Sequence, residues 1–67
     1  MDILANRLRE KREQKHYTQE DVASILNINR VTYTCWEKGK HEPKLEDLVK
    51  LANIFETSTD YLLGRYN

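Results

Sequence analysis

The sequence predicts an all-α fold, a compact bundle of five short helices, and three observations support this prediction. Apolar residues between Thr18 and Gly39 recur at helical spacing, and the pattern breaks once near its middle before it resumes. A second apolar pattern, between Lys44 and Phe55, repeats every three or four residues. Residue types that begin and end helices stand at the borders of both stretches.

The first helix is expected from Ile3 to Lys15, with Asp2 as its N-terminal cap. Residues Lys15 to Tyr17 would form a turn before the helix that begins at Thr18. The inward face of the first helix would be formed by Ile3, Leu4, Leu8 and the methylene stem of Lys11.

The next stretch carries the most specific pattern in the chain. Thr18 can cap a helix, because its hydroxyl accepts from the amide of Asp21 while the Asp21 carboxylate reaches back. Asn27 tolerates the left-handed backbone that ends a helix, and Asn29 can cap another helix two residues later. Two helices joined so tightly must pack at a steep angle, and the small Ala23 lets them approach. The pattern predicts a helix-turn-helix at about residues 18 to 38.

After this motif the chain is expected to turn at Gly39 and to cross a loop from Lys40 to Pro43. The fourth helix would then bury an apolar face, and Ser58 would cap a fifth helix, Thr59 to Leu63, that stops at Gly64. The apolar face of the fourth helix comprises Leu45, Leu48, Val49, Leu51, Ala52 and Phe55.

Composition narrows the functional classes. A chain of 67 residues makes one domain, residues 1–67, and no apolar run approaches the roughly 18 residues of a membrane span. The N-terminus lacks the uncharged core of a signal peptide, so we expect a cytoplasmic protein without a membrane partner. Cys35 is the single cysteine, which excludes an intrachain disulfide and leaves too few soft ligands for a structural zinc site. We therefore expect no metal and no cofactor.

The motif residues resemble the helix-turn-helix of the Xre family of transcriptional regulators, relatives of the lambdoid phage Cro and repressor proteins. The resemblance extends to Glu42-Pro43 and to the closing stretch from Ser58 to Gly64, and it implies a lambda repressor-like DNA-binding domain. The matching motif residues are Gln19, Val22, Ala23, Leu26, Ile28, Tyr33, Trp36 and the run Trp36-Glu37-Lys38-Gly39-Lys40.

The resemblance also carries expectations for single residues of the first helix and the turn after it. It implies an ion pair between Arg12 and Glu37, although Arg12 as a solvated surface charge is the alternative. His16 stands where the family often has glycine, so we expect a left-handed backbone there. Lys11 stands where the family usually has an apolar residue, which thins the expected core.

If helix 29–37 lies in a major groove, its first turn and solvent face meet base edges. Arg30 suits guanine, because its planar fork matches two acceptors, and Val31 suits the thymine methyl. The alternative is that these residues form the solvated side of an amphipathic helix. The expected base-reading residues are Asn29, Arg30, Val31, Thr34 and Cys35.

Phosphate contacts are expected from Gln19, which opens the first motif helix, and from Lys38, Lys40 and Lys44. Each lysine alone is also an ordinary surface residue, so the expectation concerns the cluster. A single small module binds DNA weakly, so we expect a homodimer that reads a palindromic operator in double-stranded DNA.

The leading functional interpretation is a sequence-specific DNA-binding transcriptional regulator, a repressor. The alternative is a protein-interaction module of antitoxin or regulatory type, which the balance of eleven basic and eleven acidic residues supports. An enzyme is disfavoured, because the sequence offers neither a glycine-rich phosphate loop nor a nucleophile with its base.

Overall fold

The computed structural model describes residues 2–65, and every regular element in this part of the chain is an α-helix. The all-α prediction is confirmed. The first helix begins at Asp2, so Asp2 lies in the first turn and is not the cap that the sequence suggested. The helices are α1 (Asp2–Gln14), α2 (Gln19–Leu26), α3 (Arg30–Glu37), α4 (Leu45–Ile54) and α5 (Thr59–Leu63).

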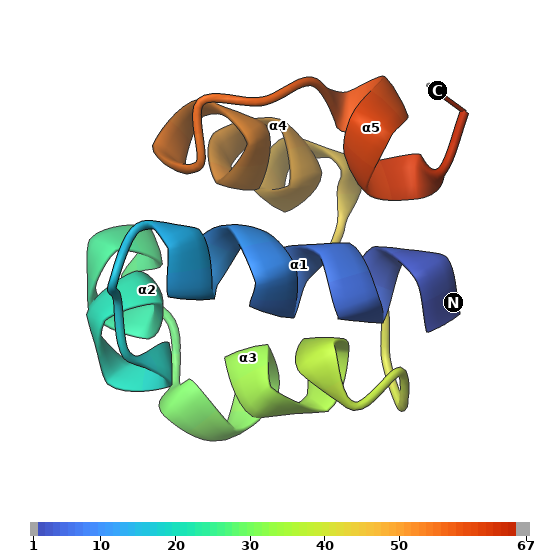
Figure 1. The fold of residues 1–67 in the computed structure, drawn as a ribbon. Helices are drawn as coiled ribbons and strands as arrows, with labels where there is room; N and C mark the ends of the chain where they lie inside the picture. The colour runs from blue at the N-terminus through green and yellow to red at the C-terminus, as the bar shows by residue number, and fades with distance from the viewer. Residues whose placement is uncertain (1, 66–67) are drawn as a thin grey trace.

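Helix α1 runs through the middle of the molecule and separates two groups of helices (Figure 1). Helix α3 packs against one side of α1 and α5 against the other, while α2 packs on α3 and α4 packs on α5. The steep packing of α2 on α3 follows from the two-residue turn between Leu26 and Asn29. As a result, α3 is an outer helix with one side against the core and one side facing away from it.

The core is built from the apolar faces of all five helices, with Leu8, Val22, Tyr33, Leu51 and Leu62 fully buried. Most of the expected core residues are confirmed, but three lie outside: Ile3 is 49% exposed, Leu45 82% and Val49 51%.

The three exceptions have structural causes. Ile3 covers Gly64, where an added Cβ would come within 2.7 Å of the Ile3 Cγ2 atom. Leu45 and Val49 lie one helical turn apart and form a second apolar stripe on the outer side of α4. Spacing by three and four residues does not tell which stripe of a helix turns inward. Lys11, where the family usually has an apolar residue, is half-buried, and its ammonium lies 4.9 Å from the centre of the Tyr61 ring.

Local capping explains where α2, α3 and α5 begin. Thr18 Oγ1 accepts from the Asp21 amide at 3.0 Å, and the Asp21 carboxylate accepts from the Thr18 amide at 2.8 Å, as a capping box requires. Asn29 Oδ1 accepts from the Val31 amide at 2.7 Å, and Ser58 Oγ accepts from the Tyr61 amide at 3.0 Å. The three predicted caps are confirmed.

Each of the five described helices is followed within two residues by a residue with left-handed backbone. At the end of α2, Asn27 has φ 59°, its amide donates to Ser24 O at 3.1 Å, and the Ile28 amide donates to Ala23 O at 2.9 Å. The expected left-handed residues are confirmed, whereas Glu56 was not foreseen because glutamate has no preference for this conformation. The five left-handed residues are His16, Asn27, Gly39, Glu56 and Gly64.

None of the helices between residues 2 and 65 has both the length and the apolar character needed to cross a membrane.

Candidate nucleic-acid interface

Helix α3 is anchored by one side and leaves the other side open. Tyr33 and Trp36 are buried and meet edge to face, with ring centroids 6.0 Å apart and ring planes at 71°. Glu37, at the end of the helix, is buried with them. The opposite side carries Arg30, whose side chain is 51% exposed, and Val31, which is 60% exposed.

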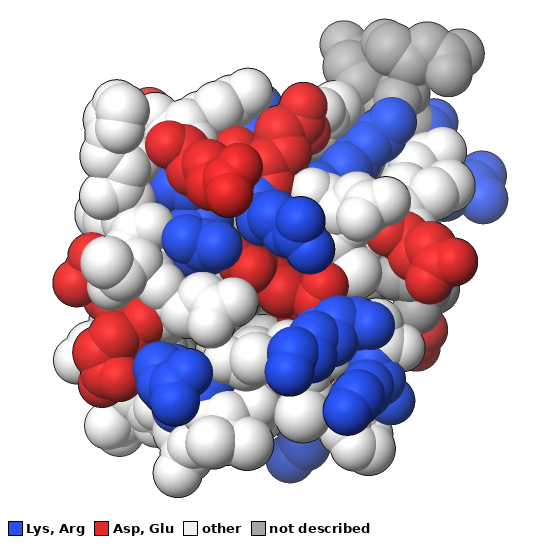
Figure 2. Space-filling view, turned by 60° about the horizontal axis from the view of Figure 1, so that its bottom comes forward, with Lys and Arg blue, Asp and Glu red and all other residues white. Residues whose placement is uncertain are grey.

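A shallow hollow lies on the open side of α3 and brings together most of the residues expected to contact DNA. Figure 2 turns this face toward the reader, with lysine and arginine side chains over much of it and acidic side chains among them. The neutral total charge therefore conceals a local basic surface at the hollow. The residues that line the hollow are Arg30, Val31, Thr34, Cys35, Lys38 and Lys40.

Three expected site residues lie outside this lining. Asn29 uses its side-chain oxygen to cap α3, which leaves its amide NH₂ group for another partner. Lys44 is exposed and stands as the N-cap of α4. The third residue, Gln19, is held in a polar network behind α3.

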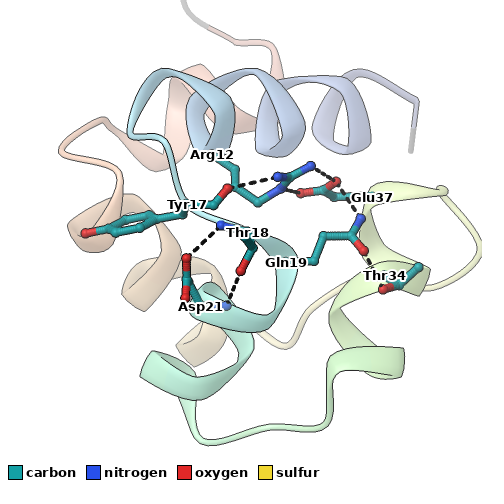
Figure 3. Close-up of polar contacts among 7 residues, drawn as sticks. All are labelled: Arg12, Tyr17, Thr18, Gln19, Asp21, Thr34 and Glu37. Atoms are coloured by element: carbon teal, nitrogen blue, oxygen red, sulfur yellow. Dashed lines mark hydrogen bonds and ion pairs between the residues drawn. The ribbon is translucent and has the colours of Figure 1, made fainter.

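The centre of that network is an ion pair between α1 and α3 (Figure 3). Arg12 Nε lies 2.7 Å from Glu37 Oε2 and Arg12 Nη2 lies 3.2 Å from Glu37 Oε1. The two side chains are only 14% and 3% exposed. A further Arg12 nitrogen, Nη1, donates to the carbonyl of Tyr17 at 3.0 Å. The expected pair is present, and the alternative of a solvated Arg12 is wrong.

Gln19 extends the network from the ion pair to the open side of α3. Its Nε2 donates to Glu37 Oε1 at 3.0 Å, and its Oε1 accepts from Thr34 Oγ1 at 3.0 Å (Figure 3). Sequence reasoning missed this link, because residues 15 and 18 positions apart carry no local signal of contact. Gln19 keeps one amide hydrogen and one lone pair for other partners.

The ion pair is charged at neutral pH. Burial alone would raise the pKa of Glu37, but hydrogen bonds, those from Arg12 and Gln19 among them, outweigh burial and hold this pKa below its ordinary value. The hydrogen bond to Glu37 raises the pKa of Arg12, and burial, followed by the nearby carboxylate, raises the pKa of Tyr33. The network thus joins α1, α2 and α3 through groups whose charges are fixed.

The fold and this surface define a class of protein: a small helical domain whose helix-turn-helix leaves one side of its second helix open. A helix-turn-helix family profile matches residues 8–62. The chain belongs to this family, the Xre-type helix-turn-helix regulators, and the resemblance seen in its motif residues is confirmed.

Individual relatives are bacterial and phage-derived regulators. The transcriptional regulator ImmR of Bacillus subtilis is 40% identical over 62 residues, which cover 92% of this chain and 49% of ImmR. The SPbeta prophage-derived regulator YonR of B. subtilis is 44% identical over 61 residues, or 91% of this chain and 56% of YonR. The phage CTXphi transcriptional repressor RstR of Vibrio cholerae is 35% identical over 63 residues, or 94% and 56%. The chain spans about half the length of these relatives.

Proposed function

We propose that this domain binds double-stranded DNA in a sequence-specific manner and that the protein acts as a transcriptional repressor. The observation that carries the proposal is the division of α3 into two sides. One side is locked by Tyr33, Trp36 and the buried Glu37, and the other side gathers the expected base-reading groups around one hollow. The relative RstR, named a transcriptional repressor, supports the direction of regulation.

Base reading is assigned to the open side of α3. Arg30 approaches Glu20 only to 3.7 Å, and both side chains are mostly exposed, so this weak pair leaves the guanidinium free to turn toward a guanine. Val31 would pack on a thymine methyl, and Cys35 would add a van der Waals contact from its place in the hollow. Asn29 would use the NH₂ group that its capping role leaves available.

Phosphate contacts are assigned to the groups around this surface. Lys38 and Lys40 line the hollow, and the exposed Lys44 follows in the same loop region. Gln19 would offer its remaining amide hydrogen or its backbone amide at the start of α2. These contacts orient the domain, and a homodimer would place two copies of α3 on half-sites about 34 Å apart in a palindromic operator.

A protein-interaction module is the second candidate, because the chain has no net charge. Titration with salt separates the two. If Lys38, Lys40 and Lys44 each displace one counterion, the logarithm of the affinity for random duplex should fall with the logarithm of salt concentration with a slope of about −2.7 per protomer. A duplex affinity that is undetectable at low salt would favour a protein partner instead.

Specificity needs a second experiment. Sequences selected from a random DNA pool should converge on one site, and a palindrome would support the dimer. Replacing Arg30 with alanine should cost about 1–3 kcal/mol of discrimination at one base pair. An unchanged sequence preference in Arg30→Ala would overturn the assignment of this residue.

A further inference from the structure

The network behind α3 ends at Thr34, a residue that also lines the hollow on the open side. Thr34 is therefore the point at which the buried ion pair reaches the proposed DNA surface. The hydroxyl of a threonine has one hydrogen to donate and two lone pairs that accept. Whether the hydrogen or only the lone pairs can face the DNA depends on which hydrogen bond Thr34 makes to Gln19.

The direction of each hydrogen bond in this network follows from chemistry. The Glu37 carboxylate is ionised beside Arg12, so it can only accept hydrogen bonds. Gln19 must therefore turn its NH₂ group toward Glu37, at 3.0 Å from Oε1, and this leaves its carbonyl oxygen directed at Thr34. A carbonyl oxygen can only accept, so Thr34 must donate its one hydrogen to Gln19.

We infer that Thr34 offers only acceptor lone pairs to the DNA and so selects a base whose major-groove edge carries an amino group, adenine or cytosine, over guanine or thymine. This inference rests on the proposed DNA binding and adds the chemical class of base that one residue reads. In the major groove, adenine N6 and cytosine N4 are donors, whereas guanine O6 and N7 and thymine O4 are acceptors. Gln19 acts here as a positioning residue, because it fixes the hydroxyl of Thr34.

The test is a comparison of base preference in wild-type protein and three variants. A site is first selected from random duplex, and competition binding then measures the affinity for four duplexes that differ at one base pair of that site. The wild type should prefer adenine or cytosine at one base pair by roughly 3- to 10-fold, the worth of one neutral hydrogen bond. Thr34→Val, which has the same shape without the hydroxyl, should lose that preference.

Gln19→Met gives the sharper test, because it leaves Thr34 in place and removes the oxygen that takes its hydrogen, together with the Nε2 bond to Glu37 on the far side from the DNA. The freed hydroxyl can then donate as well as accept, so the ratio between amino-bearing bases and the other two should fall toward one. A lost phosphate contact at Gln19 cancels in this ratio, since phosphates carry no sequence information. Ser24→Ala, an exposed position on the same helix, should leave the ratio unchanged.

Several results would overturn the inference while leaving the proposed function intact. One is a wild-type site at which Thr34→Val changes no base preference, and another is a hydroxyl-dependent preference that Gln19→Met leaves at its wild-type ratio. A preference for thymine that Thr34→Val retains would assign the contact to the methyl group instead. Failure to bind duplex at any salt concentration would reject both proposals. If Gln19→Met lacks helical circular dichroism, the Thr34→Val result decides alone.

Discussion

Replacing Arg12 with methionine should destabilise this domain more than any change to its exposed ion pairs. Methionine keeps much of the side-chain length but removes the charge, so the carboxylate of Glu37, only 3% exposed, would lose its cation. Removing one partner of a buried pair costs about 3–5 kcal/mol. The whole free energy of unfolding of a domain of this length is about 3–10 kcal/mol, so the variant should be close to unfolding.

Urea denaturation monitored by circular dichroism measures the loss of unfolding free energy. Two further variants show whether the loss comes from the unpaired buried charge. Glu20→Gln removes one charge from the exposed pair with Arg30, so its cost should stay within about 0.5 kcal/mol. The double variant Arg12→Met with Glu37→Leu should cost much less than Arg12→Met alone, because no buried charge is then left without a partner.

The pH dependence of the unfolding free energy tests independently whether the unpaired Glu37 carboxylate is what destabilises Arg12→Met. In the wild type the pKa of Glu37 is lowered, so its contribution is complete above the ordinary value of 4.5 and is lost as pH falls through the folded value. In Arg12→Met, burial without the cation should raise this pKa, so the penalty is present at neutral pH and relieved in acid. The difference in unfolding free energy between the two proteins should therefore shrink from about pH 7 to about pH 4. A constant difference, or one no larger than that of Glu20→Gln, would refute this reasoning.

Three further predictions follow from single residues. His16→Gly should raise the unfolding free energy by up to about 1 kcal/mol in urea, since φ is 60° at this position, and a loss of stability would contradict the strain argument. Lys38→Ala should reduce the salt slope of duplex binding by about 0.9, whereas Lys50→Ala, on α4 across the molecule, should leave it unchanged. Leu48→Ala should cost about 2–5 kcal/mol in thermal or urea unfolding, whereas Leu45→Ala, at an 82% exposed position, should cost less than about 0.5 kcal/mol, and equal costs would be inconsistent with the burial of α4.

Helix boundaries were predictable because short-range chemistry sets them. Thr18 with Asp21, and Asn29 with Val31, form their capping bonds within three residues, so the sequence contains both partners of each bond. The left-handed turn at Asn27 was readable for the same reason. Glu56 adopts the same left-handed backbone, and its residue type carries no signal of it.

The candidate site was predictable in its residues but not in their connections. Periodicity places Arg30 and Val31 on the open side of α3, because Tyr33 and Trp36 must be buried. It cannot show that Gln19 turns inward to Glu37 and Thr34, because that contact depends on how α2 packs on α3 in three dimensions. The ion pair of Arg12 was available only through family resemblance.

The residues that hold α3 in the fold and the residues that α3 exposes for DNA contact lie on opposite sides of the helix. A helix of eight residues has little stability of its own, so α3 depends on its caps, its aromatic anchors and the ion pair at its end. Arg30 and Val31 project from the opposite side and are mostly exposed, so exchanging them should change base preference with little effect on folding. Thr34 is bonded to the network and lines the open hollow, and it is therefore the position at which a change in specificity should also affect how α3 is held.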